Sequence, residues 1–152
     1  MEANVDRQEA IEFLLEHYEQ PRHRGELADP DVTMPGGNPG CGDVVTIYLK
    51  VDSANDAIQD LAFVGEGCTI SQAAASILLE QMQGQALTAV EALDFNWMID
   101  ELGREIVQSR PRCATLALGT LKAAIKKYRN DQIRAELGEN APAQTAPETF
   151  SN

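Results

Sequence analysis

Apolar side chains recur at the helical period in three segments of the chain. Residues 5–20 and 69–83 each carry one apolar face, and a longer face of the same kind runs over residues 112–137. Pro21 ends the first segment, and Pro111 precedes the third, where a missing N–H costs nothing. The apolar positions are Ile11, Leu14, Leu15 and Tyr18, then Ile70, Ala74, Ile77, Leu78 and Met82, and finally Ala114, Leu118, Leu121, Ile125 and Tyr128.

Two shorter helices are expected between the second and third of these segments. Thr88 followed by Glu91 has the spacing of a capping box, in which each side chain bonds the other residue's backbone N–H. Residues 95–107 carry apolar side chains at helical spacing, which predicts one further helix.

Strand patterning is confined to the first half of the chain. Residues 44–51 alternate apolar and polar side chains, and residues 57–64 form a second apolar run after a turn at 52–56. We therefore predict an antiparallel hairpin. The preceding residues 21–43 are rich in glycine and proline, which predicts a long loop with a short strand near Val32. The residues expected on one side of the first strand are Val45, Ile47, Leu49 and Val51.

Length and charge narrow the class of protein. The chain has 152 residues, which is enough for one domain, expected over residues 1–137. Residues 138–152 lack any periodic pattern and are expected to be a disordered tail. The net charge of −12 argues against nucleic acid and anionic membranes and favours locally basic partners. We find neither a membrane-spanning run nor a targeting segment, and we expect a cytoplasmic protein.

Three cysteines carry the candidate chemistry. Cys41 lies in the glycine-rich loop, Cys68 follows the second strand, and Cys113 lies in the first turn of the last helix. Glycines beside Cys41 and Cys68 should leave backbone N–H groups free to face a thiolate. The helix starts at Cys68 and Cys113 should lower the pKa of each thiol.

An acidic residue completes a possible set of four ligands. Asp43 lies two residues after Cys41, so in an extended segment both side chains can face one site. Three thiolates and one carboxylate suit Zn²⁺ or a small iron–sulfur unit, and the harder carboxylate would make the site labile. The chain has no Cys-x-x-Cys pair, so spacing alone leaves open a shared metal site or three unrelated thiols.

Three short motifs surround the cysteines: Cys-Gly-Asp from residue 41, Gly-x-Gly-Cys-x-Ile-Ser from residue 65 and Arg-Cys-Ala-Thr-Leu from residue 112. They lie in the longer segments LLEHYEQPRHRGEL, GNPGCGDVVTIYLKVD, IQDLAFVGEGCTISQAAASIL and RCATLALGTLKAAI. Over about residues 8–130, these segments and the order of their motifs resemble the IscU/SufU/NifU N-terminal family of iron–sulfur assembly proteins.

This resemblance implies a fold, a site and partners. The fold would be α+β, with a small antiparallel sheet of about three strands, helices packed on one side and a long C-terminal helix. Cys41, Asp43, Cys68 and Cys113 would converge and hold zinc or a nascent [2Fe–2S] cluster. A cysteine desulfurase would supply persulfide sulfur, and recipient apo-proteins would take the cluster.

The chain looks intermediate between the IscU and SufU types. Arg112 stands where many IscU-type proteins have histidine, and residues 108–111 do not match the Pro-Pro-Val-Lys-type segment ahead of it. We therefore do not expect the specialised chaperone that binds this segment. The sequences around Cys41 and Cys113 resemble those of SufU-type proteins. These proteins usually carry an insertion before the third cysteine, and the segment before Cys113 is too short to contain it.

Three functions remain open at this point. The first is a scaffold that builds a transient [2Fe–2S] cluster on the three cysteines and Asp43. The second is a zinc-dependent sulfur acceptor, a sulfurtransferase in which Cys41 takes the persulfide sulfur and Cys113 is the second choice. The third is an interaction module with a purely structural metal. A zinc hydrolase is disfavoured because the chain has no H-E-x-x-H motif.

Overall fold

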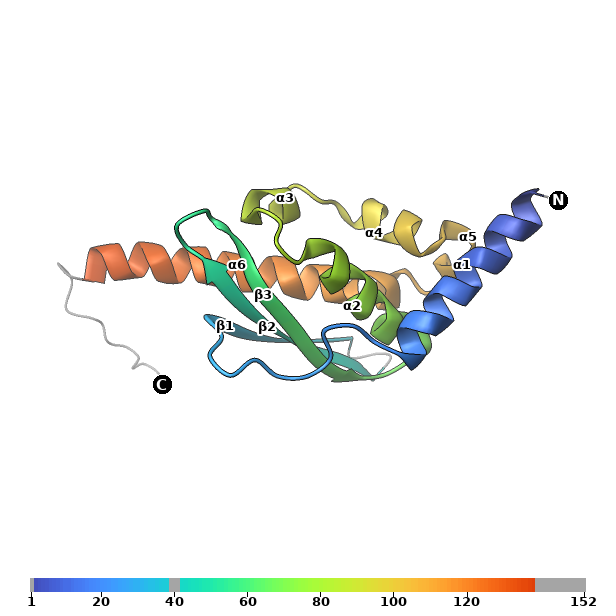
Figure 1. Cartoon of the computed structure of the whole chain (residues 1–152), viewed down its shortest axis with the longest axis horizontal. Helices are drawn as coiled ribbons and strands as arrows, with labels where there is room; N and C mark the ends of the chain where they lie inside the picture. The colour runs from blue at the N-terminus through green and yellow to red at the C-terminus, as the bar shows by residue number, and fades with distance from the viewer. Residues whose placement is uncertain (1, 39–41, 139–152) are drawn as a thin grey trace.

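A three-stranded antiparallel sheet forms one layer of the structure (Figure 1). The computed structural model describes residues 2–38 and 42–138 of the chain. The strands are β1 (Val32–Asn38), β2 (Asp43–Asp52) and β3 (Ala57–Glu66), in the spatial order β1-β2-β3. The predicted hairpin of β2 and β3 is confirmed. The short strand expected near Val32 is a full strand of seven residues, paired with β2 along its length.

Six helices accompany the sheet within the described residues. Helix α6 packs against β1 and β2, α2 packs against β3 and α6, and α1 packs against α2. Figure 1 shows α2–α6 on one side of the sheet. The α+β fold with a long C-terminal helix is therefore confirmed. The helices are α1 (Glu2–Glu19), α2 (Thr69–Met82), α3 (Leu87–Glu91), α4 (Phe95–Leu102), α5 (Arg104–Val107) and α6 (Pro111–Gly138).

The core lies between the sheet and helices α2 and α6. Alternate residues of β2 point into it, as the period of two predicts, and they are buried at every second position. Helix α2 is buried on nearly all sides, and three consecutive alanines at 73–75 let neighbouring elements approach it closely. The buried β2 residues include those predicted, Val45, Ile47, Leu49 and Val51.

Two details of the helix prediction are wrong. Helix α3 begins at Leu87 with Ala86 as its N-cap and no side-chain cap, so Thr88 lies inside the helix and forms no capping box. The helix predicted over residues 95–107 is two helices, because Gly103 adopts φ +98° between α4 and α5. Asp94 caps the first of them by accepting a hydrogen bond from the Trp97 N–H, at 2.9 Å.

Two expectations remain untested. Residues 139–152, which hold almost all of the expected tail, lie outside the described residues, so the division of the chain after residue 137 stays a prediction. Among the helices of residues 2–38 and 42–138, none has the length and apolar character that a membrane span requires.

The contact between β1 and α6 depends on the absence of a side chain at Gly36. A Cβ atom there would overlap the Thr120 hydroxyl and stand 3.1 Å from the Thr120 Cβ. Thr120 is buried, and its hydroxyl donates to the Leu116 carbonyl oxygen at 2.8 Å. The helix can therefore lie against the strand only because this strand position is glycine.

We predict that Gly36→Ala lowers the free energy of unfolding by about 1–3 kcal/mol, as for other overpacked sites. Adding Thr120→Ala should recover most of this loss, since it removes the overlapping hydroxyl. Urea unfolding of both variants measures the effect. Gly37→Ala is the control, because a Cβ there meets its nearest atom at an ordinary 3.5 Å. Equal midpoints for Gly36→Ala and the unmodified chain would contradict the account.

Candidate metal centre

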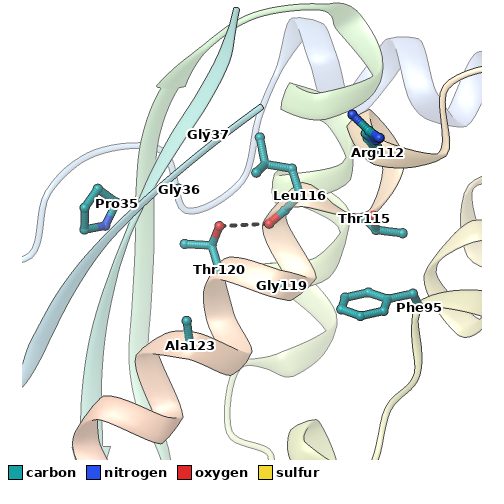
Figure 2. A pocket seen from close by; sticks show the side chains of 10 residues that line it. All are labelled: Pro35, Gly36, Gly37, Phe95, Arg112, Thr115, Leu116, Gly119, Thr120 and Ala123. Carbon is teal, nitrogen blue, oxygen red and sulfur yellow. Dashed lines mark hydrogen bonds between the residues drawn. The ribbon is translucent and has the colours of Figure 1, made fainter. Parts of the chain in front are cut away.

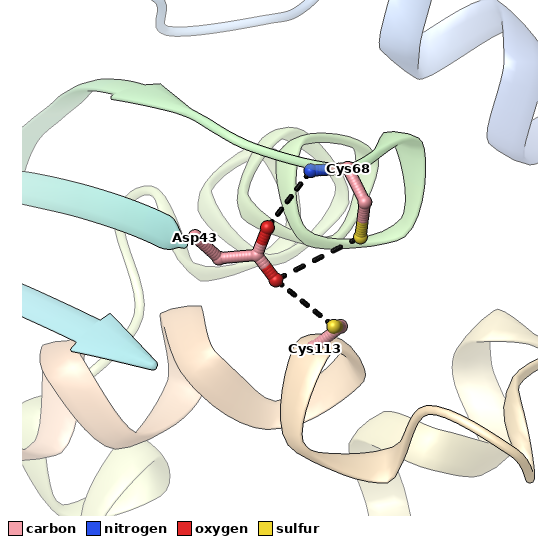
Figure 3. Close-up of side chains that lie close together, drawn as sticks. All are labelled: Asp43, Cys68 and Cys113. Carbon is pink, nitrogen blue, oxygen red and sulfur yellow. Dashed lines mark hydrogen bonds between the residues drawn. The ribbon is translucent and has the colours of Figure 1, made fainter. Parts of the chain in front are cut away.

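Three of the four predicted ligands converge at one end of the sheet (Figure 3). Asp43 is the first residue of β2, Cys68 is the N-cap of α2, and Cys113 lies in the first turn of α6. One ligand atom from each lies within 4.8 Å of the other two. The fourth predicted ligand, Cys41, lies outside the described residues.

Strand register explains why two distant segments meet. Val44 pairs with Glu66 where β2 begins and β3 ends, so the chain leaving β3 passes directly beside Asp43. Cys68 follows two residues later, at the start of α2. Packing of α6 against β1 and β2 brings Cys113 to the same point from the other side. The site therefore lies where β2, α2 and α6 all begin.

The carboxylate of Asp43 is the centre of this cluster. Its Oδ1 accepts a hydrogen bond from the Cys68 backbone N–H at 2.8 Å. Its Oδ2 accepts from the Cys113 thiol at 2.9 Å and more weakly from the Cys68 thiol at 3.8 Å. Asp43 and Cys113 are each only 1% exposed. These bonds fix the carboxylate orientation before any metal is bound.

Gly67 makes room for this carboxylate. Its φ is +146°, and a Cβ atom there would overlap Oδ1 of Asp43 and stand 2.9 Å from its Cγ. The sequence predicts that the glycines beside Cys68 leave a backbone N–H group facing a thiolate. The structure shows a different effect. The Cys68 N–H donates to the Asp43 carboxylate and does not face a thiolate.

Hydrogen bonds set the charge of Asp43. Burial alone would raise its pKa, but bonds from the Cys113 thiol, the Cys68 N–H and thiol and the Ser71 hydroxyl together hold that pKa below its usual value. The carboxyl is therefore ionised at neutral pH. Ser71 lies in the first turn of α2, where its hydroxyl also lies 3.1 Å from the Cys68 carbonyl oxygen.

The prediction of a lowered pKa for the Cys113 thiol is wrong. Burial raises this pKa well above the ordinary range, and the hydrogen bond to the Asp43 carboxylate raises it further. Both effects outweigh the dipole of α6. Without metal, Cys113 is a neutral thiol that donates to Asp43. Metal binding at this position must therefore release its proton.

The donor set fits a small tetrahedral centre. Thiolates are the soft ligands that hold zinc and iron–sulfur units in proteins, and a carboxylate can complete such a set. Ligand atoms around a tetrahedral ion with bonds of about 2.3 Å stand about 3.8 Å apart. The observed separations, up to 4.8 Å, need only a small contraction to reach this geometry.

The two histidines serve the fold. The buried His17 ring contacts the Ser76 hydroxyl at 2.6 Å and joins α1 to α2. His23 contacts the Leu61 carbonyl oxygen through Nδ1 at 3.0 Å. Neither belongs to the group of ligand atoms around Asp43.

The sequence of this chain matches one protein-family profile and several known proteins. The profile of the NifU-like N terminal domain family matches residues 10–135. The iron–sulfur cluster assembly scaffold protein IscU of Aquifex aeolicus is 34% identical over 131 residues, covering 86% of this chain and 83% of that protein. IscU of Haemophilus influenzae is also 34% identical, over 80% of this chain and 96% of its own.

Two solved structures show the same fold. A proposed iron–sulfur cluster assembly scaffold protein for the SUF system from Fervidobacterium islandicum superposes with a TM-score of 0.62 at 28% identity, covering 75% of this chain and 94% of its own. The N-terminal part of a NifU-like protein from Brucella abortus superposes with a TM-score of 0.67 at 20% identity, covering 78% and 92%, and supports the fold alone.

In metal-free protein we predict that Asp43→Asn speeds alkylation of Cys113 by iodoacetamide at pH 8. Burial still raises the pKa of this thiol, but loss of the carboxylate removes the contribution of Asp43, while the asparagine oxygen can still accept from the Cys68 N–H. Peptide mass spectrometry measures the rate at each cysteine. Asp52→Asn, at the opposite end of β2, is the control. An unchanged Cys113 rate in Asp43→Asn would contradict the role given to the carboxylate.

Proposed function

Because the chain belongs to the NifU-like N-terminal domain family and shares about a third of its residues with IscU scaffolds, we propose that it is an iron–sulfur cluster assembly scaffold. The observation that carries this proposal is the convergence of Asp43, Cys68 and Cys113 from three separate elements. In this proposal the cluster is cargo that the chain builds and hands on.

We assign the ligands as Cys68 and Cys113, with Asp43 and Cys41 completing the set of four around a [2Fe–2S] cluster. Thiolates are soft ligands that hold iron–sulfur units firmly. The carboxylate is a harder and weaker member of the set. The Asp43 carboxylate would therefore be the first of the four ligands to leave the iron when the cluster is released.

The hydrogen bonds of Asp43 support release of the cargo. In the metal-free protein its two oxygens have defined donors, the Cys68 N–H and the Cys113 thiol. A carboxylate that leaves iron therefore regains hydrogen bonds and is not left as a bare buried charge. This lowers the free energy of the empty protein relative to the loaded one.

The partners follow from this role. We propose that a cysteine desulfurase supplies the sulfur and that apo-proteins receive the cluster. Residues 108–111 read Gln-Ser-Arg-Pro, so we do not propose the chaperone that binds a Pro-Pro-Val-Lys-type segment.

A zinc-dependent sulfur acceptor is the second candidate, because two cysteines and a carboxylate that lie close together are also ligands that zinc accepts. Zinc would take the same ligands, and one cysteine would attack the desulfurase persulfide. Cys41 is the proposed acceptor because the buried Cys113 thiol has a raised pKa and is a poor nucleophile before metal binds. In this case Cys41→Ala should abolish persulfide labelling of the chain.

The scaffold proposal predicts that anaerobic incubation with ferrous iron and sulfide gives equal amounts of bound iron and acid-labile sulfide. Visible charge-transfer absorption should appear and should be lost in Cys68→Ala. Metal and sulfide analysis after gel filtration measures both. Retained zinc with no cluster would contradict the scaffold and favour the sulfur acceptor.

We also predict that Asp43→Ala slows transfer of the assembled cluster to an apo-ferredoxin by about tenfold or more. The variant lacks both the labile ligand and the carboxylate that recovers hydrogen bonds in the empty protein. Circular dichroism of the recipient follows the transfer half-time, with Asp52→Ala as the matched control. A transfer half-time equal to that of the unmodified chain would rule out this role for Asp43.

A further inference from the structure

The surface beside Cys113, which we call the mouth of the site, carries positive charge on an acidic protein. A hollow of about 560 Å³ beside Cys113 is lined by Ser109, Arg110, Pro111 and Arg112. Both arginines are exposed. Among the residues that the structure describes, neither guanidinium has a carboxylate or hydrogen-bond partner, whereas five other arginines pair with carboxylates. Those five are Arg7, Arg22, Arg104, Arg129 and Arg134.

A groove along α6 leads to these arginines (Figure 2). It measures about 360 Å³ and shares Arg112 with the hollow beside Cys113. Pro35 and the glycines of β1 form one wall, and Phe95 forms the other. Its floor is the face of α6 that holds Leu116, Gly119 and Thr120. The Phe95 ring is 47% exposed, which leaves an apolar surface open within the groove.

We propose that this groove and its arginines receive an extended acidic segment of the sulfur-donating protein. The inference rests on the proposed function and names the chemistry by which the sulfur donor is recognised. An apolar side chain of the segment packs on Phe95, and its carboxylates bind Arg110 and Arg112.

The shape and charge of the surface support this occupant. Gly119 on the floor of the groove has no side chain that would obstruct an incoming backbone, which suits an extended segment. Guanidinium groups bind carboxylates through two parallel hydrogen bonds. Because the chain carries a net charge of −12, an acidic partner is repelled elsewhere and guided to this face. The expectation of locally basic partners does not apply at the mouth of the site.

The chemistry of sulfur transfer favours the donor as the occupant. A thiolate of this chain attacks the outer sulfur of the donor persulfide, a new S–S bond forms, and the donor leaves as a thiolate. Two anions therefore meet in this step, and two anions remain afterwards. The guanidinium groups of Arg110 and Arg112 offset this repulsion without being metal ligands.

The experiment compares two routes to the cluster. In one, sulfide is added directly and no donor protein is needed. In the other, a cysteine desulfurase from the same organism and L-cysteine supply the sulfur. R110E/R112E should raise the desulfurase concentration for half-maximal assembly by about tenfold at low salt, and the difference should shrink in 0.5 M salt. Sulfide-driven assembly should be unchanged.

Matched variants separate local recognition from general effects. K126E/R134E makes the same change in net charge on an exposed part of α6 away from the site and should leave both routes unchanged. R110Q/R112Q adds no negative charge and should show a smaller loss in the same direction. Phe95→Ala should weaken only the desulfurase route, by several-fold. Ile133→Ala, also on an exposed apolar residue, should not.

The outcomes that overturn the inference are distinct from those that overturn the proposed function. Equal desulfurase dependence for R110E/R112E and the unmodified chain would overturn the inference alone. So would an equal loss in the sulfide route, or a loss confined to cluster transfer to a recipient. Absence of a cluster on the unmodified chain by the sulfide route would overturn the scaffold function, and the inference with it.

Discussion

A buried carboxylate joins the three elements from which the site is built. Asp43 opens β2, accepts a hydrogen bond from the first backbone N–H at the start of α2, and accepts another from a thiol in the first turn of α6. An ionised group that is 1% exposed is costly unless such donors surround it. Burial keeps Cys113 protonated, and its hydrogen bond to this carboxylate adds to the effect. One side chain thereby joins the three elements and contributes to the protonation state of the thiol beside it.

The rest of the fold places those donors. The register between β2 and β3 brings Cys68 beside Asp43, and the close contact of Gly36 with Thr120 sets α6 against β1. Gly67 leaves the volume that the carboxylate occupies. These glycines act through packing and backbone geometry, and a methyl group at Gly36 or Gly67 would displace the elements that meet at the site.

Much of this arrangement follows from local patterns in the sequence. The alternation of apolar and polar residues predicted β2, and the apolar faces at helical spacing predicted α2 and α6. The sequence motifs around the cysteines identified three residues that converge in the structure. The strand β1 was underestimated because its Pro35, Gly36 and Gly37 disfavour a strand locally, and only pairing with β2 decides it. The protonation of Cys113 was also missed, because burial by distant residues outweighs the local helix dipole.

The groove along α6 and the hollow beside Cys113 place exposed arginines next to the site. A chain with twice as many acidic as basic side chains leaves two arginines unpaired among its described residues, next to the buried Cys113 thiol. In our proposal, the position of these arginines, and not the net charge of the chain, governs which partner approaches the site. The acidic remainder of the surface then contributes to specificity by repelling the same partners elsewhere.

The central claim is that the Asp43 carboxylate is a ligand of the assembled cluster as well as the organiser of the empty site. Mössbauer spectroscopy of the ⁵⁷Fe-loaded protein tests it most directly. The account predicts two doublets of equal area, one from iron with sulfur ligands alone and one from iron that also binds oxygen, with the second altered in Asp43→Ala. A single doublet from two equivalent irons, unchanged in that variant, would contradict it.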